Sequence, residues 1–109
     1  MLLNEAVGAA LPATTALVVA DADAVLVDVL ARLRGAAADE AIVVLIQPDF
    51  AAIDRAMLIA ALGPLALELA PRRINAISLA DGAASERVVA AARYLAFARS
   101  TTGQSLVVG

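Results

Sequence analysis

A short, unbroken run of apolar residues, AIVVLI at positions 41–46, most constrains how this chain can fold. The run is rich in β-branched residues and Pro48 follows it, which together favour a short strand. Because its side chains are apolar on both sides, such a strand has to be covered on both faces, as in a parallel sheet flanked by helices. The run therefore predicts a buried strand of an α/β domain.

Helix-like and strand-like segments alternate along the rest of the chain. Apolar residues at helical spacing, with proline and glycine at the segment ends, predict helices at about 21–34, 50–70 and 85–99. Short apolar segments predict the remaining strands at 1–6, 74–79 and 105–108. This alternation predicts one α/β domain over residues 1–109, with about four parallel strands joined by right-handed crossovers.

Apolar residues make up 62% of the 109-residue chain, compared with an average of about 45–50%. A domain of this size buries a modest part of its surface, so the excess requires either a membrane or a partner. The longest uncharged run, residues 6–20, contains Pro12 and two threonines, whereas a membrane-spanning helix needs about 20 mostly apolar residues. We therefore expect a protein partner and no membrane segment.

Charge and residue types argue against several other functions. The net charge is −3 and the arginines are scattered, so nucleic-acid binding is not expected. The absence of cysteine excludes disulfides and thiolate metal sites and suits the cytoplasm, and no basic segment at the start indicates a signal peptide. Asp21 and Asp23 could bind a divalent cation with Glu5, but helix capping is the preferred interpretation. We expect no metal site.

Two segments of the chain resemble motifs of the short-chain dehydrogenase/reductase (SDR) family. LALELAPRRINAIS at 65–78 resembles the family's LA-ELAP-gIRVNAISPG, and RYLAFARSTTGQSLVVG at 93–109 resembles its closing fLaS…TGQ.l.vDGG. The start, MLLNEAVG, is similar to the family's LVNNAG strand end, and AIVVLI lies where the family has its IVNISS strand. The resemblance covers nearly the whole chain in order. It implies a half-Rossmann domain that lacks the N-terminal dinucleotide-binding half.

The resemblance also draws attention to chemistry that the sequence lacks. The family's Gly-rich turn, which binds the cofactor pyrophosphate, occurs nowhere, so no cofactor is expected. Counting back from ELAP, the family's proton-transferring Tyr-x-x-x-Lys pair falls on Ala51 and Arg55. The chain has no lysine, and its one tyrosine, Tyr94, lies in the last predicted helix. These vestigial positions lead us to expect no catalysis by the isolated chain.

In the SDR family, two long helices build a four-helix interface with a second subunit, and the last helix and strand build another. The resemblance therefore implies a non-catalytic SDR-like subunit that oligomerises with itself or with a full-length SDR and stabilises or shapes it. We expect docking through the helices around 22–34 and 50–70 and through 85–108. The expected interface anchors are Val25, Val29, Leu33, Met57, Leu58, Leu62, Leu65, Tyr94 and Phe97.

Three alternatives remain open. The chain could be a small-molecule binding module that uses the vestigial active-site cleft near Gln47, Asp49 and Leu79. It could be a subunit of an active oxidoreductase whose cofactor site lies on another chain, or a truncated product with no function of its own. Two further features are interpreted as structural: Arg72 and Arg73 as a solvated pair at a helix end, and Asn75 as a hydrogen-bonding residue of the resembled motif.

Overall fold

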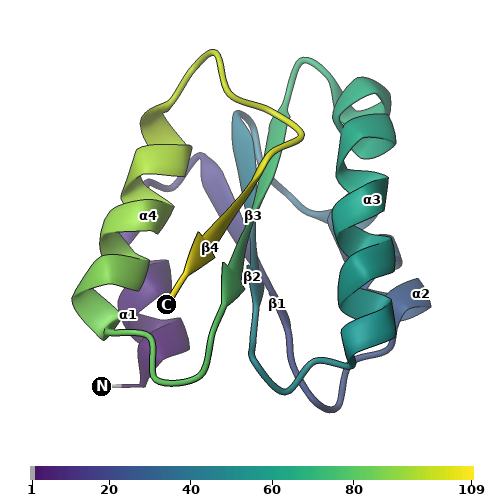
Figure 1. Cartoon of the computed structure of the whole chain (residues 1–109). Coiled ribbons are helices and arrows are strands. Elements are labelled where there is room, and N and C mark those ends of the chain that lie inside the picture. The colour runs from purple at the N-terminus through teal and green to yellow at the C-terminus, as the bar shows by residue number, and fades with distance from the viewer. Residues whose placement is uncertain (1) are drawn as a thin grey trace.

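The computed structural model describes residues 2–109, in which helices and strands alternate (Figure 1). The four helices are α1 (Leu3–Ala10), α2 (Leu26–Gly35), α3 (Ala52–Leu69) and α4 (Ser85–Phe97). The four strands are β1 (Thr15–Ala20), β2 (Ala41–Ile46), β3 (Arg73–Leu79) and β4 (Ser105–Val108). No helix within residues 2–109 is long and apolar enough to cross a membrane.

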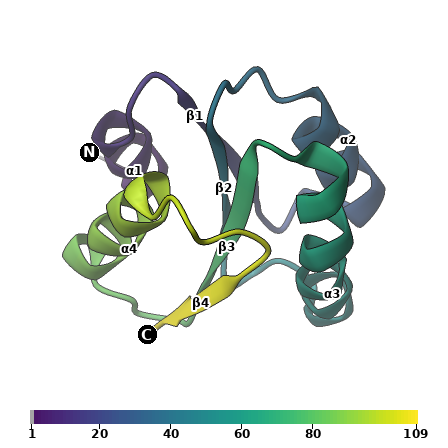
Figure 2. The same cartoon turned by 90° about the horizontal axis from the view of Figure 1, so that it is seen from above.

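The strands form one sheet in the order β1-β2-β3-β4, and each neighbouring pair is parallel. Helices α1 and α4 cover one face of the sheet, and α2 and α3 cover the other (Figures 1 and 2). The predicted fold class is therefore confirmed: the chain has an all-parallel four-stranded sheet with alternating helices, a half-Rossmann-like α/β arrangement.

The core is divided between the two faces of the sheet. In β2, which is buried throughout as its sequence predicts, Ile42, Val44 and Ile46 join the cluster under α2 and α3. Val43 and Leu45 join the cluster under α1 and α4. This division follows from the two-residue period of a strand, which turns successive side chains to opposite faces.

The prediction of a first strand at 1–6 is wrong. Residues 3–10 form α1, and the first strand is β1, TALVVA at 15–20; residue 1 lies outside the described part of the chain. Leu3, Ala6, Val7 and Ala10 follow helical spacing. Val7 is fully buried in the cluster between α1, α4 and the sheet. The helix ends before Pro12, and the β-branched residues after it favour a strand.

Candidate functional site

The carboxyl ends of parallel strands are where α/β proteins usually bind their ligands. At this edge, Arg55 in the first turn of α3 donates from Nη1 to Ser78 Oγ at 2.6 Å and from Nη2 to the Gln47 carbonyl at 2.5 Å. Gln47 Nε2 in turn donates to Asn4 Oδ1 at 2.6 Å. These bonds connect α1, the end of β2, α3 and β3, so the side chains at the centre of this edge are used to hold elements together.

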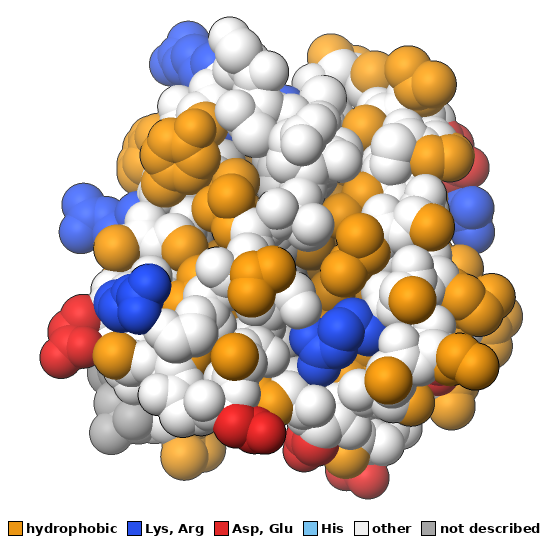
Figure 3. Space-filling view, viewed as in Figure 1, with side chains coloured by type: hydrophobic (Ala, Val, Ile, Leu, Met, Phe, Trp, Pro, Cys, Tyr) orange, Lys and Arg blue, Asp and Glu red, His pale blue; other side chains and the backbone are white. Residues whose placement is uncertain are grey.

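Carboxylates surround this group of hydrogen bonds. Asp21 and Asp23 follow β1, Asp49 follows β2 and Asp81 follows β3. Each helix also carries an acidic residue in its first turn, where a negative charge is stabilised by the positive end of the helix dipole. These residues are Glu5, Asp28, Asp54 and Glu86. Several acidic side chains are visible at the lower end of Figure 3, where the strands end. The end of the sheet at which the strands have their carboxyl ends is therefore strongly acidic.

The hollows near these carboxylates are small or open. Gln47, Pro48, Asp49 and Asp81 line one of about 230 Å³ at the ends of β2 and β3. Within residues 2–109, no three histidine, cysteine or acidic side chains lie close enough to hold a metal ion. Asp21 and Asp23 do not cap α2, because Asp21 Oδ1 accepts the Asp23 N–H at 3.1 Å and α2 has no side-chain cap.

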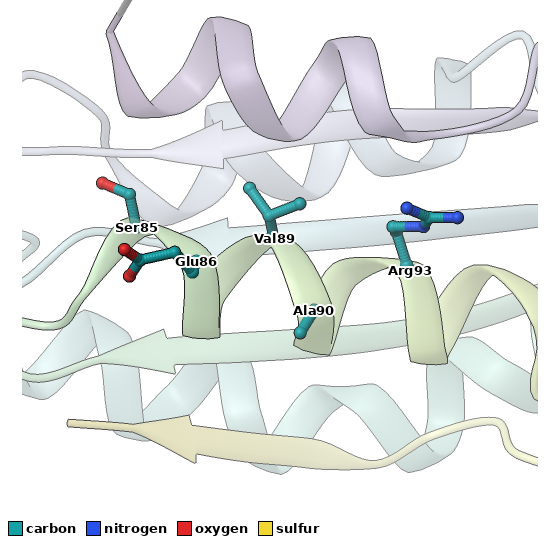
Figure 4. Close-up of a pocket in the computed structure, with 5 residues that line it drawn as sticks. All are labelled: Ser85, Glu86, Val89, Ala90 and Arg93. Atoms are coloured by element: carbon teal, nitrogen blue, oxygen red, sulfur yellow. The ribbon is translucent and has the colours of Figure 1, made fainter.

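A larger hollow, of about 670 Å³, lies along the outer side of α4. Ser85, Val89 and Arg93 point from α4 towards α1, and Glu86 and Ala90 complete the lining (Figure 4). The surface is mostly apolar, and its polar groups stand at the two ends rather than converging on one point. It offers an open contact surface and no arrangement of acid, base or nucleophile.

The residues interpreted as structural occupy structural positions. Asn75, 1% exposed, donates from Nδ2 to the Thr101 carbonyl at 2.9 Å and accepts the Gln104 N–H at Oδ1 at 3.0 Å, which confirms its expected role. Arg73 donates to three carbonyls at the end of α4, those of Leu95, Ala96 and Ala98. Arg72 donates to Ala36, which caps α2. The arginine pair therefore bonds to helix ends, but to those of α2 and α4. The prediction that the pair is solvated is wrong, because both side chains are partly buried.

The family of the chain follows from a comparison with protein-family models. The model of the SDR-like family, described as short chain dehydrogenase-like protein, matches residues 9–108. The chain belongs to this SDR-like family. No curated protein and no solved structure gives a match.

The positions that the resemblance assigns to the catalytic pair lie together in this SDR-like chain, but they carry no proton-transfer chemistry. Ala51 is the N-cap of α3 and contributes only a methyl group. Arg55 follows one turn later, and its guanidinium is a hydrogen-bond donor with no accepting atom. Tyr94 lies near the C-terminal end of α4, whereas Arg55 lies near the N-terminal end of α3, and these two helices cover opposite faces of the sheet (Figure 1).

The SDR resemblance implies a nicotinamide dinucleotide, and the residues at the strand ends do not fit it. A pyrophosphate needs backbone N–H groups from a Gly-rich turn or positive side chains. The sequence has no such turn, and the loops after β1, β2 and β3 each present a carboxylate. The one guanidinium at the centre, that of Arg55, already donates to Ser78 and Gln47.

Five of the nine expected interface anchors are wrong, because they are buried within the SDR-like chain itself. Val29, Leu33, Leu58, Leu62 and Leu65 are at most 2% exposed and pack between α2, α3 and the sheet. They cannot contact a second chain directly. The other four, Val25, Met57, Tyr94 and Phe97, are exposed and stay predictions.

Of the outward face of α3, the sequence analysis named only Met57. Its exposed residues before Glu68 carry no charge: Ala52, Ile53, Ala56, Met57, Ala60, Gly63, Pro64 and Leu67. Ile53 is 75% exposed and Leu67 is 83% exposed. The spacing of 53, 57, 60, 64 and 67 is itself helical, so the signal was present in the sequence as a second apolar stripe beside the buried one.

Proposed function

We propose that this chain is a non-catalytic SDR-like subunit that pairs with a second copy of itself through α3, and that the pairing stabilises the fold. The observation that carries the proposal is the uncharged outward face of α3. A helix on the surface of a protein usually turns polar residues outward, and a large exposed apolar patch indicates an interaction site. We further propose that the protein is cytoplasmic, in keeping with its lack of cysteine.

The stripe is long enough to form an interface. From Ile53 to Leu67 it spans about 21 Å at a rise of about 1.5 Å per residue. At one end of the stripe Asp54 lies next to Ile53, and at the other end Glu68 is paired with Arg34 of α2 at 2.7 Å. Figure 3 shows exposed apolar side chains on the right-hand side of the molecule, where α3 lies in Figure 1. A partner would therefore meet apolar surface along most of the helix, with charged residues near its two ends.

The distribution of side-chain size favours a second copy as the partner. The large residues Ile53 and Leu67 lie at the two ends of the stripe, and Ala60 lies midway between them. Two α3 helices packed antiparallel about a two-fold axis at Ala60 would bring Ile53 of each copy opposite Leu67 of the other. Small residues at the centre would let the backbones approach closely. Such a self-complementary patch suits the isologous interface of a two-fold dimer.

The chemistry of the strand ends supports a non-catalytic role. The only phenol is remote from Arg55, the sequence has no lysine, histidine or cysteine, and the carboxylate-rich edge does not fit a dinucleotide. A full-length SDR with a similar apolar helix is the alternative partner. It would replace the second copy if the purified chain stayed monomeric and formed a mixed complex with such a protein.

The pairing is tested by native mass spectrometry and sedimentation of the wild type and three variants. Met57→Asp and Ala60→Asp place a carboxylate in the proposed interface and should convert the dimer to a folded monomer. Ala90→Asp introduces the same charge at an exposed alanine of α4, across the sheet, and should leave the dimer intact. Leu58 is not a suitable probe, because it is fully buried and a charge there would unfold the chain. A dimer that survives both α3 substitutions would refute the proposal.

A further inference from the structure

Strand β1 forms one edge of the sheet, opposite β4 (Figure 2). In a parallel ladder, alternate residues turn both of their backbone groups to the same neighbour. The bonds from Gln47 N–H to the Ala20 carbonyl and from Ala41 N–H to the Thr14 carbonyl show that the even-numbered residues face β2. Thr15, Leu17 and Val19 therefore turn their backbone groups to the free edge.

This free edge lacks most features that prevent strand addition. The sequence of β1, TALVVA, has no charge and no proline, and its residues are β-formers or small. Natural proteins commonly protect such an edge with charges, prolines or bulges. Here the Thr15 N–H bonds to Pro12 in a turn, and Arg32 of α2 donates from Nη2 to the Val19 carbonyl at 2.8 Å. The backbone groups of Leu17 and the N–H of Val19 remain turned outward.

Carboxylates stand at both ends of this edge. A hollow of about 430 Å³ at the carboxyl end of β1 includes Val19 and three acidic side chains, those of Asp21, Asp23 and Asp28, together with Arg32. At the other end, Glu40 accepts a hydrogen bond from Thr14 Oγ1 at 3.1 Å, next to the exposed Asp39, in a hollow that Arg73 and Arg99 also line. An apolar edge with acidic ends is complementary to an apolar strand with basic ends.

We propose that the β1 edge binds an extended segment of a partner protein as an added strand, with an apolar middle and a basic residue at each end. The backbone of the segment bonds to Leu17 and Val19, and its basic side chains meet Asp21, Asp23 and Asp28 at one end and Glu40 at the other. This mode of recognition takes its affinity from main-chain hydrogen bonds and its specificity from side chains. The surface is distinct from the outward face of α3.

A second copy of the chain is a poor occupant of this edge. If two β1 strands paired antiparallel, Asp21 and Asp23 of each copy would lie beside Glu40 of the other. Like charges in such a position repel each other. A basic segment meets carboxylates at both ends of the edge, most of them at the carboxyl end of β1.

Amide hydrogen exchange followed by NMR tests the proposal with an internal control. The probe is the peptide Arg-Val-Thr-Val-Thr-Arg, added to the full chain, and the matched control is Glu-Val-Thr-Val-Thr-Glu. The arginine peptide should slow exchange of the Leu17 and Val19 amides by about tenfold or more. The Val18 and Ala20 amides face β2 and should be unchanged. Absence of protection at Leu17 and Val19, or equal protection by the glutamate peptide, would overturn the proposal.

Two sets of variants separate the backbone from the charges. Leu17→Pro removes an N–H that faces the free edge, where proline is tolerated, and should abolish peptide binding while Leu17→Ala retains it. The double variant Asp21→Asn/Asp23→Asn should weaken binding of the arginine peptide about threefold to tenfold and reduce its salt dependence. Because these asparagines leave β1 itself unchanged, this arm remains decisive if Leu17→Pro does not fold. Unchanged affinity and salt dependence in the double variant would refute the predicted basic partner.

Discussion

Arg55 donates a hydrogen bond of 2.6 Å from Nη1 to Ser78 Oγ and thereby joins the first turn of α3 to the end of β3. Ser78 and Asn75 are the buried polar residues among positions 2–109. The same guanidinium donates to the Gln47 carbonyl just beyond β2, and its planar shape suits two acceptors at once. At the position where the SDR resemblance places a lysine, this chain thus has an arginine that holds two neighbouring strands and a helix together.

Replacing Arg55 should destabilise the fold. Arg55→Met leaves Ser78 Oγ and the Gln47 carbonyl without this donor, and the expected loss is about 1–3 kcal/mol in the free energy of unfolding. Arg55→Lys keeps the charge but cannot reproduce the planar two-acceptor geometry, so its loss should be intermediate. Urea denaturation measures both. Arg93→Met, which removes an exposed guanidinium on α4, is the control. A stability equal to wild type in Arg55→Met would contradict this role.

Asn75 should be the most sensitive polar position of the chain. Its amide satisfies the Thr101 carbonyl and the Gln104 N–H from a site that is 1% exposed. Asn75→Ala removes both partners and should cost about 2–3 kcal/mol, with faster amide exchange in the 101–104 turn. Gln104→Ala is the matched control, because Gln104 contributes its backbone N–H and should leave the turn unchanged. Equal losses in the two variants would show that Asn75 has no special role.

The elements best predicted from sequence are those with a single strong signal. The bounds of β2 and β4 agree with the predicted 41–46 and 105–108, and α3 differs from the predicted helix by two residues at the start and one at the end. The first strand differs from its predicted place at 1–6, where a short apolar segment forms a helix instead. Such a short segment fits both structures, and the helical spacing of Leu3, Ala6, Val7 and Ala10 is the better indicator.

The side-chain arrangement was harder to predict, for two physical reasons. Helix α3 carries apolar residues at helical spacing on both of its faces, so periodicity alone cannot say whether Leu58 or Met57 meets the sheet. Only packing against β2 and β3 decides this, and it places Leu58 inside and Met57 outside. The bonds of Arg55 join residues 8 and 23 positions apart in sequence, so they depend on how the strands come together.

Thr15→Val should stabilise the protein. Thr15 Oγ1 is the one buried side-chain oxygen or nitrogen within residues 2–109 that has no hydrogen-bond partner. A buried, unpaired hydroxyl has lost its bonds to water without compensation, so replacing it by a methyl group should raise the free energy of unfolding by about 1 kcal/mol. Thermal and urea denaturation measure this change.

The neighbouring threonine provides the control for that substitution. Thr14 Oγ1 donates to Glu40 Oε2, so Thr14→Val removes a made hydrogen bond and should not stabilise the chain. A gain in stability of the same size at both positions would mean that β propensity, and not the unpaired hydroxyl, explains the effect.

The ion pair between Arg34 and Glu68 should make a small contribution to stability that depends on pH. The hydrogen bond and charge of Arg34 lower the pKa of Glu68 below its ordinary value. Because the folded-state pKa is the lower one, the stabilisation is present above the unfolded-state value of about 4.3 and is lost as pH falls through the folded-state pKa. Both side chains are about half exposed, so the effect is small and sensitive to salt.

Urea denaturation of the wild type and Glu68→Gln at several pH values tests this dependence. The wild type should be slightly more stable near neutral pH, and the two curves should converge once the pH falls below the lowered folded-state pKa of Glu68, where its carboxylate is protonated. Salt at about 1 M, where the Debye length is about 3 Å, should reduce the difference at neutral pH. A difference that persists unchanged at low pH and in high salt would assign it to packing of the Glu68 stem against α2, because neither protonation nor screening alters that contact.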